Sequence, residues 1–240
     1  MKRYLFFVLV AASLMLATSM SAAVCANATN CDFTFDQGNS SAGFGSGNFG
    51  NLNLSLSGGV ITTTIDLASG FRLIGTGFPG AFGFNQTPTQ TSLTYGGFQS
   101  GDTVATLAAT SAYSGGADSA NSLHFDGFGF FDHTAGTTAP SAGSSDAKNV
   151  VRFTISKTGG FTTIQELVDL ASPAGGDGLA YFVADVFNGN TTGPGAGLTG
   201  LIAVTGAVPE PGSYVVLLSA GFGALAFFTE RRRKKAGVTE

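Results

Sequence analysis

The sequence predicts an all-β protein, a single β-sandwich of jelly-roll or Greek-key type with one short helix, placed between two terminal segments of different composition. Short segments in which polar and apolar residues alternate are separated by Gly-, Asn- and Ser-rich turns. Hydrophobic residues make up 43% of the chain, 22 residues are Phe, and only 11% are charged. The Phe side chains can bury enough apolar area for one folded domain.

The first 26 residues have the layout of a secretory signal peptide. Lys2 and Arg3 precede an apolar run over residues 4–16, and small residues follow that run. Cleavage after Ala23 or after Ala26 satisfies the preference for small residues at the cleavage site. The sequence therefore predicts export and leaves these two cleavage sites open.

The cleavage site decides the chemistry of the two cysteines. Cleavage after Ala23 keeps both Cys25 and Cys31, which can then close a small disulfide loop in an oxidising compartment. Cleavage after Ala26 leaves Cys31 alone. Neither cysteine has the spacing partners of a zinc site.

Residues 27–207 are expected to form the β domain. Its alternating segments are, in chain order, residues 33–35, 52–57, 60–67, 123–131, 150–155, 179–187 and 198–204. Gly58 and Gly59 fit the turn of a hairpin between the second and third segments. Thr163 begins a capping-box pattern, so we expect it to cap a short helix that ends before Pro173. The Gly- and Ser-rich tract 43–50 is expected to be a flexible linker.

The charge of the β domain excludes one class of partner. Residues 27–207 contain 4 basic and 12 acidic residues, so their formal charge is 4 − 12 = −8. Nucleic-acid binding needs clustered cations that neutralise phosphates, and this domain has only scattered ones. We therefore expect no nucleic-acid partner.

An uncharged run over residues 214–228 ends in a cluster of five cations at 231–235. As a helix its 15 residues rise about 22 Å, against a hydrocarbon core of about 30 Å, so the expected transmembrane helix is short. The cations act as a stop and place the C-terminus in the cytoplasm and residues 27–207 outside. The sequence thus predicts a membrane anchor at this end.

The order of features at the C-terminus resembles the PEP-CTERM sorting signal over residues 208–235. The residues that carry the resemblance are Val208, Pro209, Glu210, Pro211, Arg231, Arg232 and Arg233. It implies that exosortase, a membrane-embedded transpeptidase-like protease, recognises the signal and processes the protein near the Pro-Glu-Pro motif. It further implies delivery to the cell surface or extracellular matrix of a Gram-negative bacterium that makes exopolysaccharide. Similar tails occur on some ice-binding proteins, so the tail does not define what the body does.

Four residues are candidate metal ligands, namely His124, Asp126, Asp132 and His133. His124 and Asp126 lie on one face of an expected strand, so a polar outer face beside a Gly-rich turn explains them without a metal. The strand–loop–helix contexts of nucleotide sites and of serine hydrolases are missing from the sequence. We therefore predict no metal, no cofactor and no catalytic residues.

These observations predict a non-enzymatic surface or extracellular-matrix protein, associated with exopolysaccharide or biofilm. Its expected partners are exosortase, the membrane and exopolysaccharide, and its C-terminal helix anchors it until processing. One alternative is a carbohydrate- or ice-binding module with flat Thr-bearing faces such as Thr62–Thr64. A less favoured alternative is a β-sandwich hydrolase, which needs a clustered acid–base pair.

Overall fold

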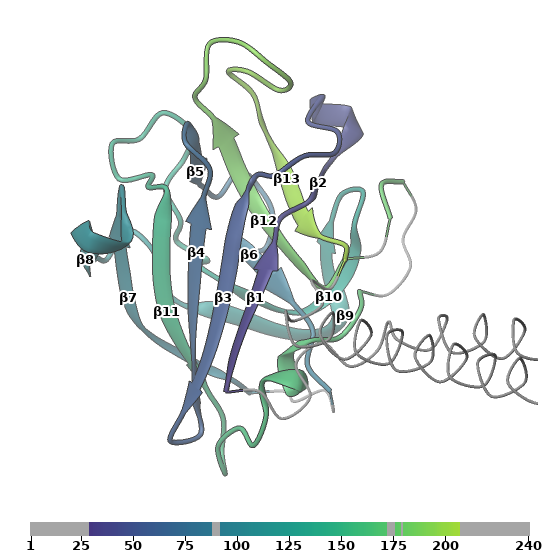
Figure 1. The fold of residues 1–240 in the computed structure, drawn as a ribbon. Helices are drawn as coiled ribbons and strands as arrows, with labels where there is room; N and C mark the ends of the chain where they lie inside the picture. Colours follow the sequence, from purple (N-terminus) through teal and green to yellow (C-terminus); the bar gives the residue numbers. More distant parts are fainter. Residues whose placement is uncertain (1–28, 88–91, 172–175, 179, 207–240) are drawn as a thin grey trace, which may run out of the picture. The chain divides into compact units, whose positions relative to one another are not determined.

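The computed structural model describes residues 29–87, 92–171, 176–178 and 180–206, all within the unit Met1–Ala207. They form two antiparallel sheets (Figure 1) and the short 3-10 helices η2 (Ser40–Ala42), η3 (Val104–Thr106) and η4 (Ile164–Leu167). The expected signal peptide, sorting signal and helix 214–228 lie outside the described residues. Among the described residues, no helix is long and apolar enough to cross a membrane.

The first sheet has six strands in the order β1-β3-β4-β11-β7-β8. They are β1 (Asn30–Thr34), β3 (Gly50–Ser57), β4 (Val60–Leu67), β11 (Val150–Ser156), β7 (Thr94–Gly101) and β8 (Ala108–Ala109). The long strands lie side by side at the front of Figure 1. Side chains along β3 alternate between the inner and the outer face of this sheet. Leu52 and Leu54 are fully buried on the inner face, while Asn51 points to the outer face and is exposed.

The second sheet has seven strands, with the order β2-β13-β12-β6-β10-β9 and with β5 paired to β12. They are β2 (Gln37–Gly38), β13 (Thr199–Val204), β12 (Phe182–Asn188), β6 (Phe82–Phe84), β10 (Gly129–Ala135), β9 (Gly116–Phe125) and β5 (Phe71–Leu73). The expected two-sheet, all-β architecture is therefore confirmed for the described residues.

The main hydrophobic core lies between the sheets. The ring of Phe33 lies 5.1 Å from that of Phe182, and the ring of Phe82 lies 5.9 Å from that of Phe153, so each pair joins one sheet to the other. Burying a Phe side chain contributes about 1.5–3 kcal/mol, which makes these aromatic residues the main support of the fold.

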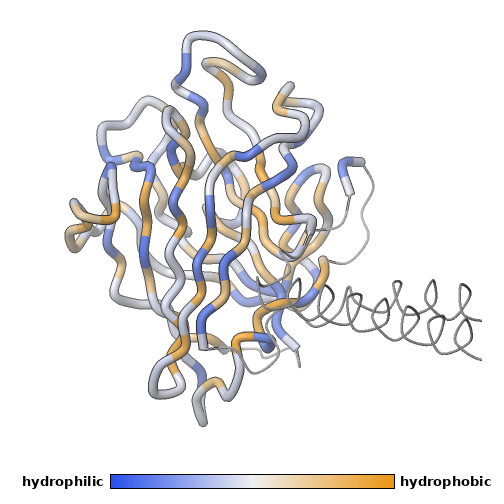
Figure 2. The backbone as a smooth tube through the Cα atoms, in the orientation of Figure 1, coloured by the Kyte–Doolittle hydropathy of each residue, from blue (hydrophilic) through white to orange (hydrophobic). Residues whose placement is uncertain are grey.

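The two sheets differ in what covers their outer faces. A second apolar cluster covers the outside of the second sheet and includes Phe125, Phe128, Phe131, Val183 and Leu201. The outer face of the first sheet instead carries Asn, Thr, Asp and Arg side chains, and Figure 2 shows hydrophilic and hydrophobic positions alternating along its strands. The first sheet is therefore the one with a polar face open to a ligand.

Two local expectations are confirmed. Gly58 and Gly59 connect β3 to β4 with φ angles of 56° and 79°, the left-handed values that a tight hairpin turn requires. A short helix follows Thr163, whose backbone N–H donates to Oε1 of Glu166 at 3.2 Å. That helix is a single 3-10 turn and ends at Leu167.

Two other expectations are wrong. Residues 123–131 are not one segment, because they contain the end of β9, a turn at residues 126–128 and the start of β10. The tract 43–50 is not a flexible linker, because Phe44 is only 2% exposed and its ring lies 5.9 Å from that of Phe71. Phe49 is also buried, and its ring lies 5.5 Å from that of Phe71, so two aromatic side chains anchor this Gly-rich tract to the core.

Candidate functional site

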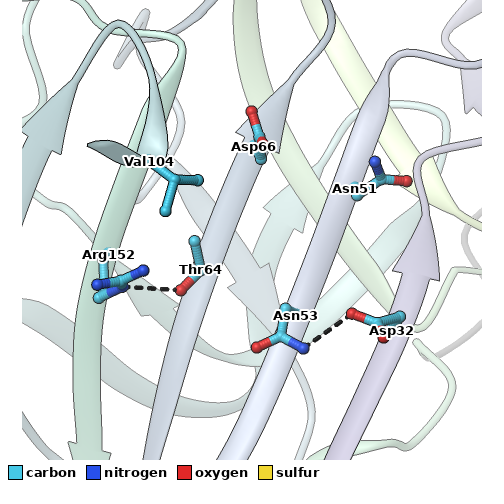
Figure 3. A pocket seen from close by; sticks show the side chains of 7 residues that line it. All are labelled: Asp32, Asn51, Asn53, Thr64, Asp66, Val104 and Arg152. Atoms are coloured by element: carbon cyan, nitrogen blue, oxygen red, sulfur yellow. Dashed lines mark hydrogen bonds between the residues drawn. The ribbon is translucent and has the colours of Figure 1, made fainter. Parts of the chain in front are cut away.

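A shallow hollow of about 500 Å³ lies on the outer face of the first sheet (Figure 3). We call it the sheet hollow, and it is lined by Asp32, Asn51, Asn53, Thr64, Asp66, Val104 and Arg152. Six of these residues come from strands β1, β3, β4 and β11, and Val104 comes from η3. The site is thus built mainly on rigid sheet.

Strand register places these side chains in transverse rows. Asp32 pairs with Asn53, Asn53 pairs with Thr64, and Thr64 pairs with Arg152, so one row crosses four strands. In the next row Asn51 pairs with Asp66. Because neighbouring strands lie about 4.8 Å apart, the first row is about 14 Å long. That length exceeds one sugar ring.

Hydrogen bonds within the row hold its side chains in place. The amide nitrogen of Asn53 donates to Oδ1 of Asp32 at 2.8 Å and to Oδ1 of Asn30 at 2.9 Å. Nε of Arg152 donates to Oγ1 of Thr64 at 3.0 Å, as the dashed lines of Figure 3 show for two of these contacts. Side chains fixed before a ligand arrives lose less conformational entropy when it binds.

The same side chains keep donors and acceptors open. Within the described part of the chain, the Asp66 carboxylate, the terminal nitrogens of Arg152 and the amide nitrogen of Asn51 make no hydrogen bond. Carboxylates only accept, whereas guanidinium and amide nitrogens only donate. A hydroxyl group does both, so a ligand rich in hydroxyls can use this mixed set.

The two carboxylates of the hollow are not placed as a hydrolytic pair. Strand β3 separates Asp32 from Asp66, and the register offsets them by two residues. From strand spacing and rise their Cα atoms are about 12 Å apart. Asp32 and Asp66 are therefore two separate acceptors on the outer face of the first sheet.

The four candidate metal ligands do not come together. Nδ1 of His124 lies 3.5 Å from Oδ1 of Asp126, and both side chains are exposed at the β9–β10 turn. Asp132 and His133 are buried on β10, where a register shift between Phe131 and His133 turns His133 toward the core. Within the described ranges, no group of three or more His, Cys, Asp or Glu residues could hold a metal ion.

His133, which is buried, belongs instead to a cluster with the half-buried Asp118 and Tyr95. Nδ1 of His133 lies 2.8 Å from Oδ1 of Asp118, and the Tyr95 hydroxyl donates to the same oxygen at 2.6 Å. The backbone N–H of Leu93 donates to Oδ2 at 2.9 Å. Tyr95 lies on β7 of the first sheet, while the other two side chains lie on β9 and β10, so the cluster ties the sheets together.

The cluster shifts the pKa values of two of its members. Burial and the hydrogen bond to Asp118 raise the pKa of Tyr95. Burial also acts to raise the pKa of Asp118, but the hydrogen bonds from Tyr95, His133 and Leu93 outweigh it and lower that pKa. The carboxylate is thus held ionised as an acceptor. Its partners come from both sheets, which indicates a structural role.

Comparison of the chain with protein-family models, with curated proteins and with solved structures finds no match. The site therefore has to be interpreted from its own residues.

Sequence reasoning missed the sheet hollow as a site. Alternation did place Asn53, Thr64 and Arg152 opposite apolar neighbours, which is the signal of a polar outer face. It could not show that β4 would lie between β3 and β11, which are far apart in the sequence. That long-range pairing is what assembles the row.

Proposed function

We propose that this chain is an exported, non-enzymatic surface or matrix protein that binds polysaccharide through the sheet hollow. The observation that supports it is the row Asp32–Asn53–Thr64–Arg152, fixed by internal hydrogen bonds and still offering unused donors and acceptors. Such a set matches the hydroxyl groups of sugars, each of which donates and accepts. Exopolysaccharide is the ligand that agrees with an exported protein.

Ice binding is less well supported. Thr62 and Thr64 lie on the outer face of β4, and Thr62 pairs with Ser55 and Thr154, so one row carries hydroxyl groups, but the next row does not repeat it. Thr64 pairs with Asn53 and Arg152, and Asp66 follows it on the same face. Charged groups bind liquid water strongly and interrupt a flat hydroxyl surface, so the face suits individual hydroxyl contacts better.

The affinity of the hollow for a short sugar is expected to be modest. No aromatic side chain lines it, and Val104, which is 46% exposed, is its one apolar wall. A few hydrogen bonds to charged groups, offset by the entropy of association, correspond to a Kd of about 0.1–1 mM. Repeated units of a polymer would raise the apparent affinity.

Sorting by the C-terminal tail is part of the same proposal. The order of Pro209-Glu210-Pro211, a short apolar run and a cationic cluster supports recognition by exosortase in the membrane, followed by release to the surface. A protein delivered in this way would meet exopolysaccharide where the sheet hollow can bind it.

Binding is tested with the full chain and immobilised bacterial exopolysaccharide fractions. The variant Asn53→Ala/Arg152→Ala removes two members of the row and should weaken binding at least about tenfold. His124→Ala changes an exposed side chain of the other sheet and serves as the control. Unfolding curves of all three proteins check that the fold is kept. Equal binding by the double variant and the wild type would exclude the hollow as the site.

Sorting is tested separately with a tag inserted in the β domain. The tagged chain and its Pro209→Ala/Glu210→Ala/Pro211→Ala variant are followed in cells with and without exosortase. We expect the wild type to be shortened and delivered to the surface only where exosortase is present. If every form keeps its C-terminus and its location, the tail is only an anchor.

A further inference from the structure

A second hollow of about 440 Å³ adjoins the first. We call it the end hollow, and it is lined by Leu67, Ser69, Gly70, Arg72, Asp102, Thr103, Asn149 and Gly189. Asp66 lines the sheet hollow and the next residue, Leu67, lines the end hollow. In the same way Val104 lines the first and Thr103 the second. Residues adjacent in the chain therefore line the two hollows at two places, the end of β4 and the start of η3.

The end hollow contains a cation without a partner. Arg72 is exposed, and among the described residues it makes no hydrogen bond or ion pair. The carboxylate in the same hollow, Asp102, already faces Lys148 at 3.5 Å between Nζ and Oδ2. Arg72 thus offers a free guanidinium beside a carboxylate that is already neutralised.

Cations are concentrated at this place. Residues 27–207 contain only four basic side chains against 12 acidic ones. Arg152 lines the sheet hollow, Arg72 lines the end hollow, and Lys148 pairs with a lining residue of the end hollow. The same two hollows are also lined by three acids, namely Asp32, Asp66 and Asp102, so the local formal charge is balanced. Acids farther away are screened beyond about 8 Å at physiological ionic strength, so the group left to attract an anion is the unpaired guanidinium of Arg72.

We propose that the polysaccharide is acidic, with hydroxyl groups of one sugar in the sheet hollow and the carboxylate of a neighbouring uronic acid on Arg72 in the end hollow. This inference rests on the proposed function and adds the class of ligand. Guanidinium and carboxylate match as a planar, two-bond pair, which is stronger than a bond between neutral groups. A polysaccharide whose uronic acid lies one or more sugar units away from the sugar in the sheet hollow can occupy both hollows at once.

The experiment uses matched polymers, namely polygalacturonate, polymannuronate and polyglucuronate, each beside the same polymer with its carboxyl groups reduced to alcohols. Binding of the full chain is measured by affinity electrophoresis at 50 mM and 500 mM salt. We expect at least one acidic polymer to bind about tenfold more tightly than its reduced form at low salt, with most of that preference lost at high salt.

Variants separate the two hollows. Arg72→Ala should remove the preference for the acidic over the reduced polymer, whereas Arg72→Lys should keep part of that preference. Asn53→Ala/Arg152→Ala should weaken binding of both forms. Ala120→Asp, on the edge strand β9, is the control, because it lowers the net charge by the same amount as Arg72→Ala. This control should keep the preference for the acidic polymer.

The outcomes that contradict the proposals differ. If reduced polymers bind as tightly as acidic ones, or if Arg72→Ala keeps the preference, the acidic ligand is wrong and polysaccharide binding stands. If no polymer of either form binds, both the proposed function and this inference fail.

Discussion

Asp185 on β12 is a carboxyl group with only half of its hydrogen-bonding capacity used. The backbone N–H and the hydroxyl of Thr76 donate to Oδ2 at 2.6 and 2.8 Å. Oδ1 is buried and has no partner among the described residues. Burial raises the pKa of Asp185 to about 6, and the bonds from Thr76 offset part of that effect. An ionised Asp185 is therefore a cost to the folded state.

We expect Asp185→Asn to stabilise the protein at pH 7.5 and to give no such gain at pH 4. The folded-state pKa of about 6 exceeds the ordinary aspartate value of 3.8. The free energy of unfolding is thus highest at low pH, where Asp185 is protonated in both the folded and the unfolded state. It falls by about 3 kcal/mol in total as pH rises through the folded-state pKa of about 6. Asn keeps an acceptor for Thr76 without the charge, so a gain of about 1–3 kcal/mol is expected.

Urea unfolding at the two pH values, measured on both proteins, checks this. Asp146→Asn, at an exposed position, serves as a control with the same loss of charge. If Asp185→Asn raised the free energy of unfolding equally at pH 4 and pH 7.5, ionisation of Asp185 would not destabilise the folded state.

The cluster of Tyr95, Asp118 and His133 should act as a unit. Asp118→Ala removes the acceptor of both partners and should cost about 3 kcal/mol, whereas Tyr95→Phe should cost about 1 kcal/mol. Because the pKa of Asp118 is lowered on folding, its contribution is present above its unfolded pKa and is lost as pH falls through the folded value. A double-mutant cycle with zero coupling between Tyr95 and Asp118 would contradict the shared hydrogen bond.

At the scale of elements, the start of η4 is fixed by one side chain. Oε1 of Glu166 accepts from the backbone N–H of Thr162 at 2.7 Å and of Thr163 at 3.2 Å, and its other oxygen pairs with Lys157. Burial acts to raise the pKa of Glu166, but these donors together lower it to about 2. The carboxylate therefore satisfies N–H groups that the short helix cannot pair itself.

We expect Glu166→Gln to lower the free energy of unfolding by about 1.5 kcal/mol at pH 7. The difference should disappear as pH falls from 4.5 toward 2, because the wild-type carboxylate is protonated over that interval. Thermal unfolding across this range measures it. A constant difference at every pH would mean that the charge of Glu166 plays no part.

The β3–β4 hairpin offers a matched pair of glycines. Gly58 has open space around a Cβ position, whereas a Cβ on Gly59 would lie 3.1 Å from Cα of Gly160. Asn tolerates left-handed φ values, so Gly58→Asn should change stability by less than about 0.5 kcal/mol. Gly59→Val should cost more than about 2 kcal/mol. Chemical unfolding of both variants decides, and equal effects would contradict this turn geometry.

Which elements could be predicted depended on side-chain alternation. β4 and β11 alternate apolar and polar residues over most of their length and are rich in β-branched residues, and the sequence predicted both. β7 was missed because Gly96 and Gly97 interrupt its pattern, and the first part of β9 was missed because it is an exposed edge with few apolar side chains. The sheet hollow was missed for a different reason, since it depends on pairing between distant strands.

At the scale of the whole molecule, the first strand, β1, contains a residue that forms a disulfide. Cys31 is 3% exposed and disulfide-bonded, and the only other cysteine of the chain, Cys25, lies outside the described residues. Cleavage after Ala26 would remove Cys25. The disulfide state of Cys31 therefore favours cleavage after Ala23, the alternative that keeps both cysteines.

We expect the mature protein to begin at Val24 and to carry one intramolecular disulfide. Mass spectrometry should find this N-terminus, and reduction should add the mass of two hydrogen atoms. Closing so short a loop stabilises by about 2 kcal/mol, so Cys31→Ala should lower stability by at least that amount under oxidising conditions. An N-terminus at Asn27 would contradict the pairing, and intact Met1 in envelope fractions would contradict cleavage itself.

The position of Val104 on the wall of the sheet hollow has a practical consequence for spectroscopy. The chain contains no Trp, so none of its intrinsic fluorescence comes from an indole. A Val104→Trp variant would carry the sole indole, on an exposed site that borders the row of polar side chains. Its emission would respond to a sugar that displaces water from the hollow, without background from the Phe-rich interior. This single substitution would thus allow binding of the proposed sugar ligand to be followed by fluorescence.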